Sequence, residues 1–206
     1  MGALSPPSAL DRLLALARTL SRVGVWVGGA LTLASVALIT FEVLARRFFG
    51  FTMGGADELS GYAFAISVTW ALAFTALERA NVRIDVLYQY LPVRLSAAFD
   101  WIALVALGVF AVYLSYYGGQ VAMTSWSMQS AANTPLGTPL WIPQTLWFGG
   151  LAWFVVVLAL MLLRASTALV TGDMASLKAL AGVKSSVEEA EEGAAEGQRL
   201  VRGEAT

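Results

Sequence analysis

The hydrophobic residues of this chain are gathered in long uncharged runs. Residues Val23–Phe41 carry no charge and are followed by Glu42, and residues Leu59–Leu77 carry no charge and are followed by Glu78. A third uncharged run extends from Trp101 to Leu163. The hydrocarbon core of a bilayer is about 30 Å thick and is crossed by about 20 helical residues. The first two runs therefore each match one crossing, and the third is long enough for two.

A polar stretch rich in helix-breaking residues divides the third run. It contains Gln120, Gln129, Asn133, Pro135, Gly137, Pro139 and Pro143. Proline and glycine at this density end helices. Because backbone groups in lipid must be hydrogen-bonded within the protein, each crossing should be a helix. The pattern predicts an all-α integral membrane protein with four transmembrane helices, at about residues 23–45, 59–78, 99–121 and 144–163.

The connection between the last two predicted spans leaves two alternatives open. One is a protein of three spans. The other is a re-entrant or shallow dip of residues 122–143, where Trp126 and Trp141 suit the membrane interface.

Two segments outside the spans have the pattern of interfacial amphipathic helices. Between Leu10 and Arg22 apolar residues recur at helical spacing, and the arginines lie largely off that stripe. The segment Val82–Leu91 is similar and is followed by Pro92. A short connecting helix with snorkelling arginines explains such a segment more simply than a specific lipid site does.

The basic residues predict the orientation. With four spans, one side of the membrane holds most of them: Arg12, Arg18, Arg22, Arg79, Arg83, Arg94, Arg164 and Lys178. The other side holds Arg46 and Arg47. Because cytoplasmic loops are enriched in Lys and Arg, both termini are expected in the cytoplasm.

Three regions follow from this pattern. Residues 1–22 are expected to form a cytoplasmic N-terminal interfacial helix, and residues 23–164 a four-span membrane domain. Residues 165–206 include the stretch VEEAEEGAAEGQRLVRGEAT, which is acidic and poor in aromatic residues. Such a composition has little to bury, so this region is expected to be a disordered cytoplasmic tail.

Composition excludes several classes of function. The chain is 58% hydrophobic and 13% charged, whereas soluble domains average about 25% charged residues. It has no His and no Cys, which removes the commonest metal ligands, the usual proton shuttle and a cysteine nucleophile. We therefore expect no catalytic, cofactor-binding or metal-binding residues. The net charge of −1 gives no sign of nucleic-acid binding.

Acidic residues near the span ends are the candidates for chemistry. Glu42 could belong to an ion relay, but an ion pair with Arg46 four residues later explains it more simply. Asp57 and Glu58 could bind a cation together with Glu42. The simpler interpretation is that they complement the helix dipole, and that Glu58 pairs back to Arg46 or Arg47.

Three stretches resemble the small membrane subunit of TRAP transporters (tripartite ATP-independent periplasmic transporters, DctQ-like). The stretch FEVLARRFFGFTMGGADELSGYAF is similar to the join of the family's first two spans and contains Arg46, Phe49 and the pair Asp57–Glu58. The stretch ALERANVRIDVLYQYLP is similar to its next segment and contains Asp85, with Asn81 where relatives often have His. The stretch TPLGTPLWIPQTLWFGG is similar to the entry of the fourth span and contains Trp141 and Pro143.

The resemblance implies a role in a larger assembly of the bacterial inner membrane. In the family the small subunit is a scaffold beside a large multi-span permease, which carries the substrate and sodium sites. A periplasmic binding protein delivers the substrate, typically an organic acid, and an ion gradient drives uptake. The expected partners are these two proteins and membrane lipid, and the candidate structural or partner-contact residues are Glu42, Arg46, Arg47, Asp57, Glu58, Asn81, Asp85, Trp141 and Pro143.

Other functions compete with this one. A free-standing four-helix channel or transporter would need a polar stripe through the spans, and the few Ser and Thr residues there make a poor pore. A non-transport membrane assembly protein is a further alternative, and a membrane enzyme is disfavoured by the absent His and Cys. Within a transporter, the first two spans, with their glycines, are the expected contact with the large subunit.

Overall fold

A computed structural model describes residues 9–79 and 92–173, together with residues 180, 193–195, 197–198 and 202. Its main helices are α1 (Ala9–Phe49), α2 (Ala56–Leu77), α3 (Val93–Ser127) and α4 (Trp141–Thr171). Each is long and apolar enough to cross a membrane. The prediction of an all-α protein with four membrane-spanning helices is thus confirmed.

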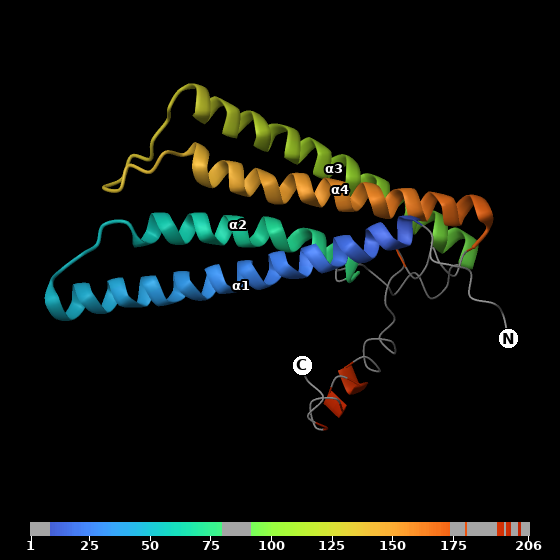
Figure 1. The fold of residues 1–206 in the computed structure, drawn as a ribbon, viewed down its shortest axis with the longest axis horizontal. Coiled ribbons are helices and arrows are strands. Elements are labelled where there is room, and N and C mark those ends of the chain that lie inside the picture. The colour runs from blue at the N-terminus through green and yellow to red at the C-terminus, as the bar shows by residue number, and fades with distance from the viewer. Residues whose placement is uncertain are drawn as a thin grey trace.

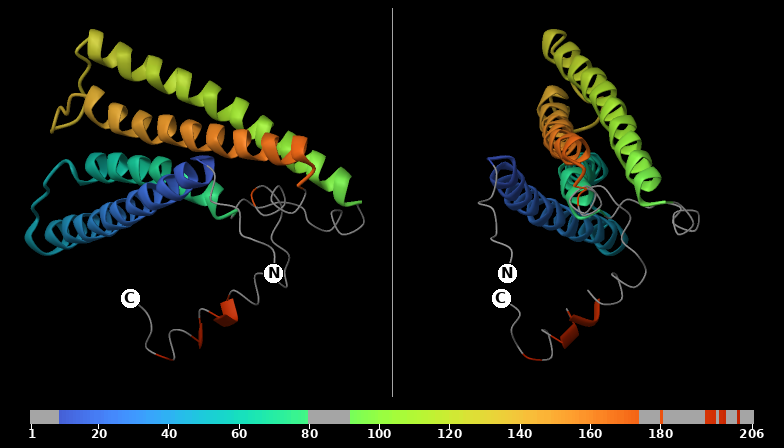
Figure 2. Two further views of the ribbon diagram at one scale, coloured as in Figure 1. Left: turned by 45° about the vertical axis from the view of Figure 1, so that its right-hand side comes forward. Right: turned by 90° about the vertical axis from the view of Figure 1, so that its right-hand side faces the viewer.

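The four helices form two antiparallel hairpins that pack side by side (Figure 1). α1 packs along α2, α3 packs along α4, and the two hairpins meet mainly through α2 and α4. Across the array the order is therefore α1, α2, α4, α3, with α1 and α3 at the two edges (Figure 2). Residues 50–55 and 128–140 connect the helices at what we call the loop end, and α1 begins and α4 ends at the opposite, termini end. Which side of the membrane each end faces stays a prediction.

All four helices are longer than the spans predicted for them, α1, α3 and α4 by eight residues or more. α1 has 41 residues, which corresponds to about 60 Å at 1.5 Å per residue. Ala9–Arg22 is part of this helix rather than a separate interfacial helix, because no proline interrupts the chain between it and the first span. The boundary expected after residue 22 therefore lies inside α1, and the one expected after residue 164 lies inside α4.

The other expectations have mixed outcomes. α3 continues to Ser127, so the non-helical connection is shorter than the predicted 122–143. The predicted interfacial segment 82–91 lies outside the described residues. The same is true of residues 174–206 of the expected acidic tail, apart from a few scattered positions.

Small residues allow the helices to approach closely inside the chain. A Cβ atom on Gly28 of α1 would lie 3.2 Å from Cα of Ser67 in α2, and one on Gly150 of α4 would lie 2.6 Å from Oγ1 of Thr69 in α2. Gly118 of α3 lies against the ring of Trp147 in α4 in the same way. Such contacts are typical of helix packing in membranes, where tight van der Waals fit replaces the hydrophobic effect. These three glycines thus serve contacts between the helices of this chain.

Indole groups add hydrogen bonds between the helices. Trp101 of α3 donates to Oγ of Ser166 in α4 at 3.0 Å, and Trp153 of α4 donates to Oγ of Ser21 in α1 at 3.0 Å. In lipid, an indole N–H without a partner is unfavourable. These bonds therefore add directional links to an interior composed mostly of apolar side chains.

Candidate functional site

The predicted site residues that the structure describes gather at the loop end. Glu42, Arg46 and Arg47 lie in the last turns of α1, and Asp57 and Glu58 lie in the first turn of α2. Trp141 and Pro143 lie in the first turn of α4, where the missing N–H of a proline leaves no helical hydrogen bond unmade. Asn81 and Asp85 lie outside the described residues, so their roles stay predictions.

Glu42 anchors the connection that follows its own helix. Its side chain is buried and accepts a hydrogen bond from the hydroxyl of Thr52 and one of 2.9 Å from the backbone N–H of Met53. Arg46 is near enough to attract the carboxylate electrostatically, but the two do not form a salt bridge within the described part of the chain. The carboxylate therefore folds residues 50–55 back onto α1.

Glu58 plays the matching role for the other connection. Its carboxylate accepts hydrogen bonds from the hydroxyl of Tyr62 at 2.9 Å and from the hydroxyl of Thr134. The hydroxyl and backbone N–H of Thr138 face the same group. The prediction that Glu58 pairs with Arg46 or Arg47 was wrong, because residues 128–140 lie over the start of α2 and place hydroxyl donors closer than either arginine.

The two connections also pack directly on each other. Gly54 has a positive φ of 70°, a conformation that costs glycine little, and a Cβ atom there would lie 3.4 Å from the ring of Pro135. At Gly55 a Cβ atom would lie 2.1 Å from Cδ1 of Leu136. A larger residue at position 55 would therefore have to displace the side chain of Leu136, which covers this glycine.

The aromatic and charged candidates surround this cluster. Trp141 meets Trp126 edge-on, with ring centroids 4.6 Å apart, and so holds the end of α3 against the start of α4. Asp57, Arg46 and Arg47 are exposed. Asp57 lies in the first turn of α2, where its charge complements the helix dipole.

At the termini end, ionic groups link the helices. Arg164 of α4 donates to Asp11 of α1 at 2.9 Å. Arg18 of α1 lies 3.2 Å from the carboxylate of Glu78 and donates to the backbone carbonyl of Leu77 at the end of α2. These partners are far apart in sequence, so residue spacing contains no sign of them.

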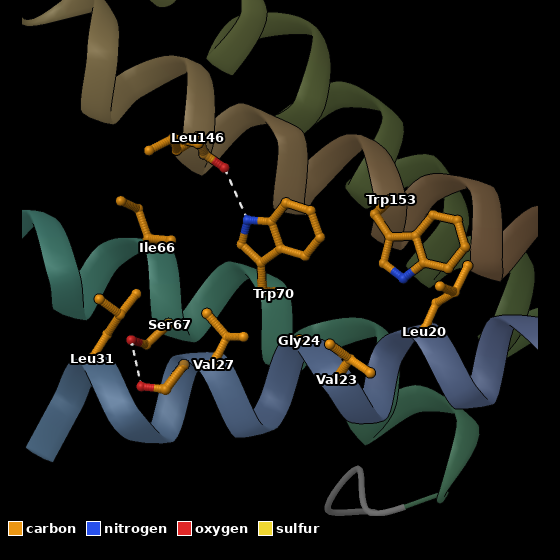
Figure 3. A pocket seen from close by; sticks show the side chains of 11 residues that line it. Leu20, Val23, Gly24, Val27, Leu31, Ile66, Ser67, Trp70, Leu146 and Trp153 are labelled. Carbon is orange, nitrogen blue, oxygen red and sulfur yellow. Dashed lines mark hydrogen bonds between the residues drawn. The ribbon is translucent and has the colours of Figure 1, made fainter.

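An apolar groove lies between α1, α2 and α4. Its volume is about 550 Å³, and it is lined chiefly by aliphatic and aromatic side chains (Figure 3). Its few polar groups are used for packing: Trp70 donates to the carbonyl of Leu146 at 3.0 Å, and Ser67 donates to the carbonyl of Gly28 at 2.8 Å. A charged substrate would find no counter-charge in this groove.

The described residues contain no group of three or more His, Cys, Asp or Glu side chains that could hold a metal ion. Glu42 and Glu58 are each bound to hydroxyl or amide donors and lie on different helices. The shared cation site considered for Glu42, Asp57 and Glu58 is therefore not assembled in the described residues.

The comparison with protein families identifies this arrangement. Residues 35–168 match the family described as "Tripartite ATP-independent periplasmic transporters, DctQ component". The chain belongs to the DctQ family. The match spans most of the four-helix frame, and DctQ is a component of a transporter. Comparisons with curated proteins and with solved structures gave no match.

The DctQ match begins at residue 35, within α1, and ends at residue 168, near the end of α4. It includes both carboxylate anchors and the loop end. The sequence located Glu42 and Glu58, but reasoning from it missed Thr52, Thr134 and Thr138, which complete those anchors. Threonines in polar connections are common, so their presence contained no specific signal.

Proposed function

We propose that this DctQ chain is the small scaffold subunit of a TRAP transporter, holding the large permease subunit in the bilayer while substrate crosses elsewhere. The observation that carries this proposal is how its polar groups are used. The acidic groups are bound to partners within the chain: Glu42 and Glu58 at the loop end, and Asp11 and Glu78 at the termini end. The groove between the helices is apolar. Transport sites in membranes usually need ionisable or polar groups facing a pathway.

The links at the two ends of the array also favour a scaffold role. The loop end is braced by two carboxylate anchors and by glycines under Pro135 and Leu136. The termini end is braced by the Arg164–Asp11 pair. A frame linked at both ends suits a part that stays still while a partner moves.

The rest of the proposal follows from the family. The partners are a large multi-span permease and a periplasmic substrate-binding protein, and the complex lies in the bacterial inner membrane with both termini of this chain in the cytoplasm. The transported compound is an organic acid. A gradient of ions, with sodium as the proposed coupling ion, drives uptake.

Reconstitution tests the scaffold role. The large subunit is placed in liposomes with and without this chain, the binding protein and labelled substrate are added, and uptake is measured under a sodium gradient. Uptake should require this chain. Full uptake by the large subunit alone would refute the scaffold role.

A second measurement separates the role from simple folding assistance. The large subunit is purified with this chain, reconstituted, and then compared with a sample from which this chain was removed in detergent. If the large subunit stays folded, as its thermal unfolding reports, and yet loses transport, the chain acts during the transport cycle. If both are lost together, its role is to stabilise the large subunit.

A further inference from the structure

The outward face of α3 differs from the other membrane-facing surfaces of the array. α3 lies at one edge and packs mainly on α4 (Figures 1 and 2). The side chains of Tyr113, Tyr116 and Tyr117 are exposed by 62%, 61% and 50%. Residues three and four positions apart share a helix face, so the three rings form one surface.

Tyr113 lies near the middle of the helix. Tyr113 is 13 residues after Asp100, the last charge before the apolar run, and 14 residues before Ser127, where α3 ends. At 1.5 Å per residue each distance is about 20 Å. Tyrosine is enriched where a membrane meets water, and Tyr113 is too deep in the helix for that explanation.

The hydroxyl groups on this face have few partners. On α1, the hydroxyls of Thr32, Ser35 and Thr40 each donate to a carbonyl of their own helix, so they need no partner from outside it. A tyrosine hydroxyl lies beyond the ring and cannot do this. The rings of Tyr113 and Tyr117 contact each other, with centroids 4.6 Å apart, and the hydroxyl of Tyr116 has no hydrogen-bond partner among the residues described.

A hollow beside Tyr116 adds a second observation. It is open, has a volume of about 400 Å³, and is lined by side chains that include Ser115, Gln120 and Phe148. Gln120 lies one helical turn from Tyr116, is exposed, and its amide has no hydrogen-bond partner in the part of the chain that the structure describes. The phenol of Tyr116 lies one turn deeper in the helix than this amide, and lipid tails would leave it unpaired, which is unfavourable.

We propose that this face, with Tyr113, Tyr116 and Gln120 at its centre, is where a transmembrane helix of the large permease subunit docks. Hydrogen-bond complementarity argues for a protein occupant, because lipid tails offer neither donors nor acceptors at this depth, whereas Ser, Thr, Asn or Gln on a facing helix offers both. The hollow leaves room for its side chains. This inference rests on the proposed function, and it assigns the contact to α3 instead of the first two spans.

Photo-crosslinking in the intact complex tests the assignment. A benzophenone side chain is introduced as Tyr116→p-benzoylphenylalanine on α3, and in a matched variant as Trp26→p-benzoylphenylalanine on α1, where the native side chain is 76% exposed. Both replace one aromatic group with another. After irradiation of membranes, the product from position 116 should contain the large subunit, and that from position 26 should contain lipid only.

The other outcomes are distinguishable. Crosslinking to the large subunit from position 26 alone would overturn the assignment and keep the scaffold role. A crosslink from position 116 to lipid only, or to a second copy of this chain, would also overturn it. If the large subunit does not co-purify even with the unmodified chain, the proposed function itself fails.

A second variant removes the hydrogen-bond groups and keeps the shape. Tyr116→Phe combined with Gln120→Leu should reduce the amount of large subunit recovered with this chain in mild detergent by several-fold. Thermal unfolding of the isolated variant chain should match that of the native chain. Undiminished recovery would refute the importance of these groups.

Discussion

Replacing Gly150 with alanine tests how closely α2 and α4 must approach. A Cβ atom at this position would lie 2.6 Å from Oγ1 of Thr69 and 2.9 Å from its backbone carbonyl carbon. Contacts between carbon atoms are favourable at about 3.5–4.0 Å, so the helices must separate by roughly 0.6 Å or more. Rotation of the Thr69 side chain cannot relieve the contact with the backbone.

The cost of this substitution can be estimated against a matched variant. Inserting a methyl group into a well-packed interior costs about 1–3 kcal/mol. Alanine also raises helix propensity over glycine by about 1 kcal/mol in water. Gly108→Ala in α3 isolates that second effect, since a Cβ atom there meets nothing within 4 Å. We therefore expect Gly150→Ala to be about 1–3 kcal/mol less stable than Gly108→Ala.

Thermal unfolding of the purified chain in mild detergent, followed by tryptophan fluorescence, measures the difference. For a domain of this size each kcal/mol shifts the midpoint by about 2–4 °C, so Gly150→Ala should unfold roughly 2–12 °C below Gly108→Ala. Equal midpoints for the two variants would refute the reasoning. They would mean that the interface between α2 and α4 can widen without loss.

Three further predictions concern the links at the two ends and in the groove. Glu58→Gln should speed hydrogen exchange of the backbone amides of residues 130–139, because a neutral amide is a weaker acceptor; Asp57→Asn should not, and equal exchange in both would contradict the anchor. Asp11→Arg and Arg164→Asp should each lower the unfolding midpoint, whereas the double variant should recover most of the loss. No recovery in the double variant would show that the pair makes no contact. Trp70→Phe, which loses the hydrogen bond to α4, should also lower the midpoint, and an unchanged value would show that this bond adds no stability.

The anchors show how far residue spacing alone could go. Glu42 and Glu58 were recognisable as acids at adjoining helix ends, because each interrupts or borders a long apolar run. The partner of Glu58 was not recognisable. Thr134 is 76 residues away, and an arginine nearer in sequence was the more obvious counter-ion. A contact of this kind depends on how the two hairpins are placed, which local sequence does not specify.

The glycines also show that local sequence does not specify which helices come into contact. Their number in the first span suggested a surface for a partner, but Gly28 contacts Ser67 of α2 inside the chain. Conversely, the exposed tyrosines of α3 carried no signal in the sequence, since aromatic residues are common in membrane helices. Only the position of α3 at the edge of the array shows which of its faces is free.

The sequence by itself determined the four spans and the family. The thickness of the bilayer sets the length of an apolar run, and each membrane helix satisfies its own backbone hydrogen bonds. The spans can therefore be recognised from local sequence. The tertiary structure decided which glycines, hydroxyls and carboxylates meet, and which face of α3 remains uncovered. These depend on the order α1, α2, α4, α3, which arises from close fit between distant segments and not from the hydrophobicity of any one of them.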